Sequence, residues 1–142
     1  MIVTDASAAI LLFTDQDTDP RVETARHVLN TDPAWIVPEH WHTEMFSAIR
    51  GLWLGKKLGD GPAERATTAL ARMTVGTTST APLLSRMWEL RSSLSAYDAG
   101  YVAAAESHGL TLVTADARIA RSGVARCDIH VIARPGQTGD ES

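Results

Sequence analysis

The stretch SAYDAGYVAAAESHGLTLVTAD, residues 95–116, predicts a helix followed directly by a buried strand. Ser95 is of a type that commonly caps helix N-termini, and the alanine-rich residues 97–108 are typical of a helix. Gly109 suits a left-handed C-terminal stop, and residues 110–114 form a short apolar run that is typical of a buried strand. A helix that leads into a buried strand is a repeating unit of α/β proteins.

Two carboxylates lie at the ends of these elements. Asp98 falls in the first turn of the predicted helix, and Asp116 follows the strand directly. In a parallel sheet, ligands collect at the edge where the strands end. Each aspartate also has a purely structural interpretation: Asp98 can complete a capping pair with Ser95, and Asp116 can cap a helix that begins at Ala117. This stretch alone leaves both interpretations open.

The remaining sequence predicts further short strands separated by helices. We expect strands at residues 2–4, 35–37 and 129–132 and an edge strand or loop at 74–80. Helices are expected at 8–13 with Ser7 as cap, from Pro20, from Pro38 to about Lys57, at 62–73 with Ala66, Ala69, Leu70 and Met73 inward, from Pro82 to about Leu94, and at 117–122. This order predicts an α/β fold, a three-layer α/β/α arrangement with a parallel sheet between helices.

Length and composition predict one domain at residues 1–134 and a polar tail at 135–142. The single Cys127 cannot pair within the chain, and it offers no zinc spacing with the five histidines, so a reducing cytoplasm is the expected location. We expect no membrane span and no signal peptide. The net charge of -4 argues against a broad basic nucleic-acid surface, but it does not exclude an enzyme that acts on nucleic acid.

Two further acids join Asp98 and Asp116 at comparable places. Asp5 follows the first predicted strand, and Glu44 lies on a helix flank in line with Ala48, Gly51 and Gly55, which leave room around its carboxylate. As alternatives, Asp5 can be a turn residue and Glu44 a solvated surface residue. No GxxxxGK[ST], HExxH or GxSxG motif occurs, which argues against the commonest nucleotide, zinc-protease and hydrolase sites.

Four converging carboxylates need a counter-charge. Two like charges 4 Å apart repel by about 4 kcal/mol at an effective dielectric constant of 20. A hard divalent cation such as Mg²⁺ or Mn²⁺ offsets this repulsion and suits carboxylate oxygens. Such a cation can position water and stabilise charge on a phosphodiester. The alternatives are a Mg²⁺-dependent phosphatase or phosphotransfer domain and a binding module without catalysis.

Four segments together resemble PIN-domain proteins, and among them the VapC-type toxin ribonucleases. They are IVTDAS at the start, PEHWHTE around Glu44, SAYDAGYVAAAESHG and LVTAD, in the order and approximate spacing of that family. The resemblance implies a five-stranded parallel sheet, a Mg²⁺- or Mn²⁺-dependent endoribonuclease acting on RNA, frequent homodimers, and inhibition by a cognate VapB-type antitoxin. We place the homodimer contact around the apolar residues Trp53 and Leu54.

The resemblance also implies roles for individual residues. Asp5, Glu44, Asp98 and Asp116 match the acidic quartet of the family, with Asp5 and Asp98 as the first metal ligands. Asp116 would add direct or water-mediated coordination, Glu44 would orient water, and Ser7 and Thr114 would support the acids by hydrogen bonds. Some members carry one more acid after the Asp116 position, where this chain has Ala117 and Arg118, which puts a second metal site in doubt. Arg118 is then either a phosphate contact or a solvated residue.

Overall fold

The computed structural model describes residues 1–136 and shows a five-stranded sheet in which all neighbouring strands are parallel. The order across the sheet is β3-β2-β1-β4-β5. The strands are β1 (Ile2–Thr4), β2 (Trp35–Pro38), β3 (Gly76–Thr78), β4 (Leu112–Thr114) and β5 (Ile129–Val131). The predicted parallel sheet is therefore confirmed, and the Thr-rich segment forms its edge strand.

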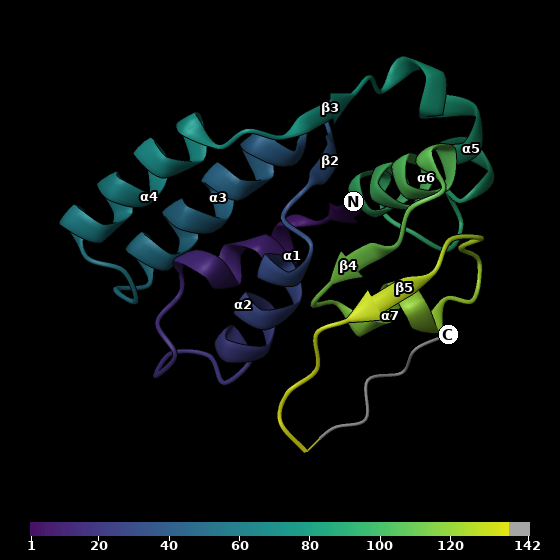
Figure 1. Cartoon of the computed structure of the whole chain (residues 1–142). Coiled ribbons are helices and arrows are strands. Elements are labelled where there is room, and N and C mark those ends of the chain that lie inside the picture. The colour runs from purple at the N-terminus through teal and green to yellow at the C-terminus, as the bar shows by residue number, and fades with distance from the viewer. Residues whose placement is uncertain (137–142) are drawn as a thin grey trace.

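Helices cover both faces of the sheet, as the three-layer prediction requires (Figure 1). Right-handed crossovers place the helices between β1 and β3 on one face and those after β3 on the other. The first group is α1 (Ala6–Ala9), α2 (Val22–Thr31), α3 (Trp41–Leu54) and α4 (Asp60–Arg72), with a 3-10 turn η1 (Ile10–Phe13) after α1. The second is α5 (Leu84–Glu89), α6 (Ala96–His108) and α7 (Ala117–Arg121), preceded by η2 (Ala81–Leu83).

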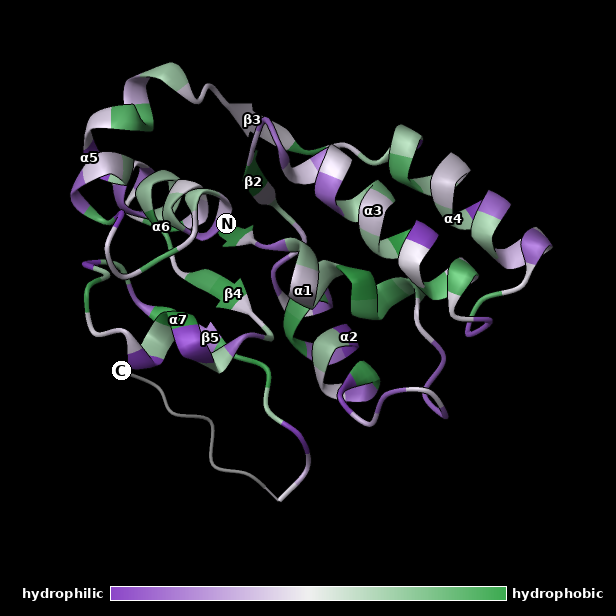
Figure 2. Cartoon of the chain, turned by 180° about the vertical axis from the view of Figure 1, so that it is seen from behind, coloured by the Kyte–Doolittle hydropathy of each residue, from purple (hydrophilic) through white to green (hydrophobic). Residues whose placement is uncertain are grey.

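The two central strands, β1 and β4, are buried along their whole length. Their apolar side chains are covered by helices on both sides, as expected for strands inside a parallel sheet. Figure 2 shows the contrast: β4 is largely in the hydrophobic colours, whereas hydrophilic residues are frequent along α4 and in the segment before α2. Strand order reverses between β1 and β4, and a crevice at such a switch point is the usual ligand site of α/β sheets.

Helix α6 has the predicted boundaries almost to the residue. Ser95 caps it by accepting a hydrogen bond from the Asp98 amide, and Gly109 ends it in the left-handed conformation at φ 63°. Every residue from Ala99 to Ala105 is buried. Small side chains allow this helix to pack closely on the sheet, and its first turn lies beside the strand ends.

Several predicted helix starts were wrong, mainly at prolines. Pro20 lies in a turn in which the Arg21 amide donates a hydrogen bond to the Asp19 carboxylate, and α2 begins only at Val22. Pro38 is the last residue of β2 and pairs with Thr78, which delays α3 to Trp41. Pro62 lies inside the first turn of α4, where a missing N–H costs little.

Other expectations need smaller corrections. Asp5, not Ser7, caps the first helix, because its carboxylate accepts from the amide of Ala8. The helix expected to reach Leu94 ends at Glu89, and Ala69 faces solvent. Residues 137–142 of the expected polar tail lie outside the described part of the chain. Within residues 1–136, the structure contains no helix that is both long and apolar enough to span a membrane.

Candidate active site

Asp5 lies immediately after β1 and is nearly inaccessible, with 3% of its surface exposed. Its backbone amide donates to the Val113 carbonyl of β4 at 3.1 Å. Its carboxylate accepts from the Ala8 amide at 3.0 Å, from the Ser7 hydroxyl at 2.7 Å and from the Thr114 hydroxyl. The fold therefore fixes this carboxylate at the junction of the two central strands.

Burial makes the ionised form of Asp5 costly. It raises the pKa of the Asp5 carboxyl from 3.8 to about 6, although the hydrogen bonds from Thr114, Ser7 and Ala8 oppose this shift. The negative charge of Asp98 adds to the increase. A buried acid that retains such a pKa with three donors around it is typical of a functional site.

Ser7 and Thr114 connect the ends of β1 and β4. The Ser7 hydroxyl also accepts from the Ala115 amide at 2.9 Å, and the Thr114 hydroxyl accepts from the Asp116 amide at 3.0 Å. The two hydroxyls lie 3.2 Å apart. The same side chains thus hold Asp5 and the backbone that carries Asp116.

Asp98 enters the site from the first turn of α6. Burial raises the pKa of its carboxyl, partly opposed by the Ser95 hydroxyl, and the charge of Asp116 raises it further. Asp98 in turn raises the pKa of Asp5. The charge of Asp116 thus acts on Asp98, and the charge of Asp98 acts on Asp5.

Asp116 has a cationic partner within its own turn. Its carboxylate caps α7 by accepting from the Arg118 amide at 3.0 Å, and it also binds the Arg118 guanidinium through Nε at 2.9 Å and Nη2 at 2.7 Å. The Arg118 guanidinium holds the pKa of Asp116 below its usual range. The capping interpretation of Asp116 is therefore correct, and Arg118 is a solvent-exposed residue that pairs with Asp116.

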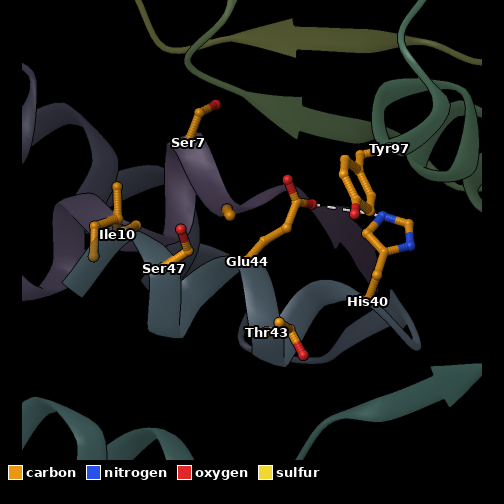
Figure 3. A pocket seen from close by; sticks show the side chains of 9 residues that line it. Ser7, Ile10, His40, Thr43, Glu44, Ser47 and Tyr97 are labelled. Atoms are coloured by element: carbon orange, nitrogen blue, oxygen red, sulfur yellow. Dashed lines mark ion pairs between the residues drawn. The ribbon is translucent and has the colours of Figure 1, made fainter. Parts of the chain in front are cut away.

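Glu44 comes from the first turns of α3 and faces a pocket of about 640 Å³ (Figure 3). Ser7 borders the same pocket, which therefore begins at the Asp5 site. Glu44 Oε1 lies 3.6 Å from His40 Nε2, too far for a hydrogen bond. Burial lowers the pKa of His40, so its imidazole is neutral near pH 7 and the contact is not an ion pair there.

The partly buried His40 and Glu44, which line the pocket, form a polar cluster with the buried Tyr101. Burial and the neighbouring Glu44 raise the pKa of the Tyr101 hydroxyl. Within residues 1–136, His40 Nε2, Glu44 Oε1 and the Tyr101 hydroxyl are buried and have no protein partner at hydrogen-bond geometry. Trp41 Nε1 is the fourth such atom in the described part of the chain, and because buried polar atoms without partners are uncommon, each calls for an explanation such as a catalytic role or a bound water.

The donor chemistry fits a hard cation at Asp5 and Asp98, although the four acids do not form a preformed cage. Among the described residues, no three acids, histidines or cysteines are arranged as a metal-binding group. Mg²⁺ commonly binds through one or two carboxylates, waters and substrate phosphate. The coupled Asp5 and Asp98, both with raised pKa values, supply that minimum.

Sequence reasoning missed His40, Tyr97 and Tyr101. The only available signal was Gly100, an unexpected glycine inside an alanine-rich helix. An added Cβ there would lie 2.6 Å from His40 Cε1, so Gly100 admits the imidazole between α3 and α6. The ion pair between Arg118 and Asp116 was also missed. The spacing of the two residues does not show whether the Arg118 side chain contacts the capping Asp116 or only solvent.

Comparison with known proteins extends over nearly the whole chain. A model of the PIN domain family matches residues 2–124. Ribonuclease VapC9 of Mycobacterium tuberculosis is 39% identical over 134 residues, which cover 94% of this chain and 100% of that protein. Ribonuclease VapC12 of the same organism is 30% identical over 133 residues, with 94% and 100% covered.

Solved structures show the same fold at lower sequence identity. M. tuberculosis VapC20, described as a sarcin–ricin loop cleaving toxin, aligns with a TM-score of 0.65 at 22% identity and covers 95% of this chain and 100% of that one. FitAB bound to a DNA fragment aligns with a TM-score of 0.63 at 17% identity, with 92% and 94% covered. From the family match and the VapC relatives, the chain belongs to the PIN domain family, among its VapC-type members.

Proposed function

We propose that this protein is a metal-dependent endoribonuclease and the toxin of a toxin–antitoxin pair. The observation that carries the proposal is the buried Asp5 carboxylate, which Ser7, Ala8 and Thr114 hold at the β1–β4 switch point, in a chain whose relatives are named VapC ribonucleases. Two neighbouring carboxyls with raised pKa values favour a cation between them, and phosphodiester cleavage needs positive charge.

In this proposal, Asp5 and Asp98 hold Mg²⁺ or Mn²⁺, and Asp116 contributes when Arg118 releases it. The bound ion would supply Lewis-acid stabilisation of charge on the phosphodiester. Ser7 and Thr114 keep the Asp5 carboxylate in place by donating to it. Glu44, at the edge of the pocket, would accept a proton from the attacking water or orient that water.

The names of the relatives support the partners that we propose. RNA is the proposed substrate, a VapB-type antitoxin the proposed inhibitor, and the cytoplasm the proposed location. The exposed Trp53 and Leu54 at the end of α3 support a homodimer contact, because their side chains are 44% and 54% exposed.

A phosphatase mechanism has less support from the arrangement of charges. Such enzymes pair a nucleophilic aspartate with a nearby lysine, and the only lysines here are Lys56 and Lys57, after the end of α3. α3 continues for ten residues beyond Glu44 before it ends at Leu54, which is about 15 Å along the axis, and both lysines come after that end. Neither lysine is positioned to serve the Asp5 site.

Expression of the wild type and of Asp98→Asn tests the function. We expect growth arrest and metal-dependent cleavage of cellular RNA from the wild type, and a loss of at least about 100-fold in cleavage for Asp98→Asn. Glu64→Gln, which changes an exposed acid on α4, is the matched control and should cleave like the wild type. Equal cleavage by Asp98→Asn and the wild type would refute the proposal.

A further inference from the structure

We infer that the pocket bordered by Ser7, His40, Glu44, Ser47 and Tyr97 binds one nucleobase of the RNA, next to the phosphodiester that is cleaved. This inference rests on the proposed ribonuclease function and extends it to the substrate contact. The pocket lies between α1, the first half of α3 and the start of α6, and its volume is about 640 Å³. A cavity of this volume has room for a nucleobase and its ribose.

Position ties the pocket to the acids. Glu44 and Ser7 both border it, and Ser7 donates directly to the Asp5 carboxylate at 2.7 Å. In Figure 3 the Glu44 carboxylate points toward Tyr97 and His40, and Ser47 lies beside Glu44 on the same helix. A nucleotide whose phosphate lay at Asp5 would therefore place its base or that of a neighbour in this pocket.

An aromatic wall favours a flat ligand. The Tyr97 ring is 56% exposed and packs on the His40 ring, with centroids 5.1 Å apart and planes tilted by 53°. His40 is fixed from behind by Tyr101, whose ring meets it edge-on at 4.8 Å. An exposed aromatic ring on a rigid support is the usual platform on which single-stranded RNA bases stack.

The other lining groups select a neutral ligand with polar edges. Ile10, Ala6 and Ala48 provide apolar or small surface, and the hydroxyls of Thr43 and Ser47, one helical turn apart on α3, provide donors and acceptors. The pocket lining contains no lysine or arginine, His40 is neutral near pH 7, and Glu44 is an acid. A phosphate or an acidic peptide would be repelled here, whereas a nucleobase would not.

Binding of a short RNA by Tyr97 variants tests the subsite. The probe is a 12-nucleotide RNA centred on a cleavage site mapped with the wild type, together with copies that lack one base on either side of that site. Binding is measured by fluorescence anisotropy in EDTA with protein that carries Asp116→Asn to prevent cleavage. Asp116 is not among the residues that line the pocket. We expect Tyr97→Ala to weaken binding by about 5- to 100-fold and Tyr97→Phe, which keeps the ring, to stay within about twofold.

The abasic RNAs identify the ligand as a base. With the copy that lacks the stacked base, Tyr97→Ala and its Tyr97 parent should bind equally, because the lost contact is the same. Trp88→Ala removes an aromatic residue on α5 that is even more exposed than Tyr97, and this matched control should leave binding unchanged. If Tyr97→Ala binds RNA as its Asp116→Asn parent does in EDTA, and Tyr97→Ala with Asp116 intact cleaves RNA as the wild type does, the subsite is refuted although the ribonuclease function stands. If the wild type cleaves no RNA, the proposed function fails instead.

Discussion

The His40 imidazole lies so close to Gly100 that a Cβ at residue 100 would be 2.6 Å from His40 Cε1. We therefore expect Gly100→Ala to displace the imidazole from its place between Tyr97 and Tyr101 and to lower the free energy of unfolding by about 1–3 kcal/mol. Urea unfolding measures the change.

Gly51→Ala is the matched control, because Gly51 is also a helical glycine and has no atom within 4 Å of an added Cβ. It should stabilise the protein by roughly 0.5–1 kcal/mol. The double variant His40→Ala, Gly100→Ala should recover part of the loss. Equal effects of the two glycine substitutions would show that the close approach has no energetic consequence.

Thr114→Val should destabilise the protein by about 1–3 kcal/mol, because it removes the hydroxyl that contacts Asp5, Ser7 and the Asp116 amide. It should also raise the pKa of Asp5 further, since one opposing hydrogen bond is lost. NMR titration of the Asp5 carboxyl and thermal unfolding measure the two effects. Thr114→Ser keeps the hydroxyl and should lower the free energy of unfolding by about 1 kcal/mol or less. If Thr114→Val and Thr114→Ser were equally stable, the hydroxyl would have no stabilising role.

The raised pKa of Asp5 predicts a pH-dependent stability in metal-free protein. Between pH 3.8 and about 6 the unfolded chain has already released the Asp5 proton while the folded protein retains it. The contribution of this group to stability is therefore present below pH 3.8 and is lost as the pH rises to about 6.

Comparison with Asp5→Asn isolates this group. The stability of the variant relative to the wild type should increase by up to about 3 kcal/mol across this range and then level off. Unfolding in EDTA at several pH values measures the difference. A constant difference from pH 4 to pH 7 would contradict the burial of an ionisable Asp5. Adding Mn²⁺ above pH 6 should stabilise the wild type more than the variant.

Arg118→Gln should strengthen Mn²⁺ binding, because the Arg118 guanidinium competes for the Asp116 carboxylate. The Arg118 side chain is 80% exposed, so solvent screens the pair and the gain should not exceed about fivefold. Calorimetric titration with Mn²⁺ gives the affinity. Arg65→Gln removes an exposed cation from α4 and serves as the control for net charge. Weaker Mn²⁺ binding by Arg118→Gln than by the control would contradict the competition.

Leu54→Glu should convert the proposed homodimer into a monomer, since it would place a charge in the apolar contact at the end of α3. Light scattering over a range of protein concentrations gives the oligomeric state. Leu84→Glu changes an exposed leucine on α5 and should leave the dimer intact. A wild type that is monomeric at all concentrations would remove the basis of this prediction.

The sequence could predict those elements whose signals are local. Ser95 and Gly109 define α6 because a hydroxyl cap and a left-handed glycine act on their own turn. The proline-led starts were less accurate, since a proline is equally compatible with a strand end, as at Pro38, and with the inside of a first turn, as at Pro62. Contacts with distant residues, such as the pairing of Pro38 with Thr78, decide which of these positions a proline takes.

In the candidate site, too, the sequence predicts the features that depend on local patterns and misses those that depend on distant contacts. Asp5 and Asp116 could be placed at strand ends because the parallel sheet fixes where its strands finish. The contacts of His40 with Tyr97 and Tyr101 depend on how the residue before α3 meets the first turns of α6, for which the sequence has no short-range pattern. The pairing of Asp116 with Arg118 depends on the rotamer of the Arg118 side chain, which can extend into solvent or turn back to the neighbouring carboxylate.

The pairing of β1 with β4 also has a consequence for the order of events during synthesis. Asp5 leaves the ribosome well before the Thr114 hydroxyl that binds it, which is 109 residues further along the chain. Asp98 and Asp116 also follow the edge strand β3. A nascent chain that has emerged only as far as β3 therefore lacks half of the acids and cannot close the sheet around Asp5. The proposed nuclease site therefore forms only after β4 and the residues up to Asp116 have been made.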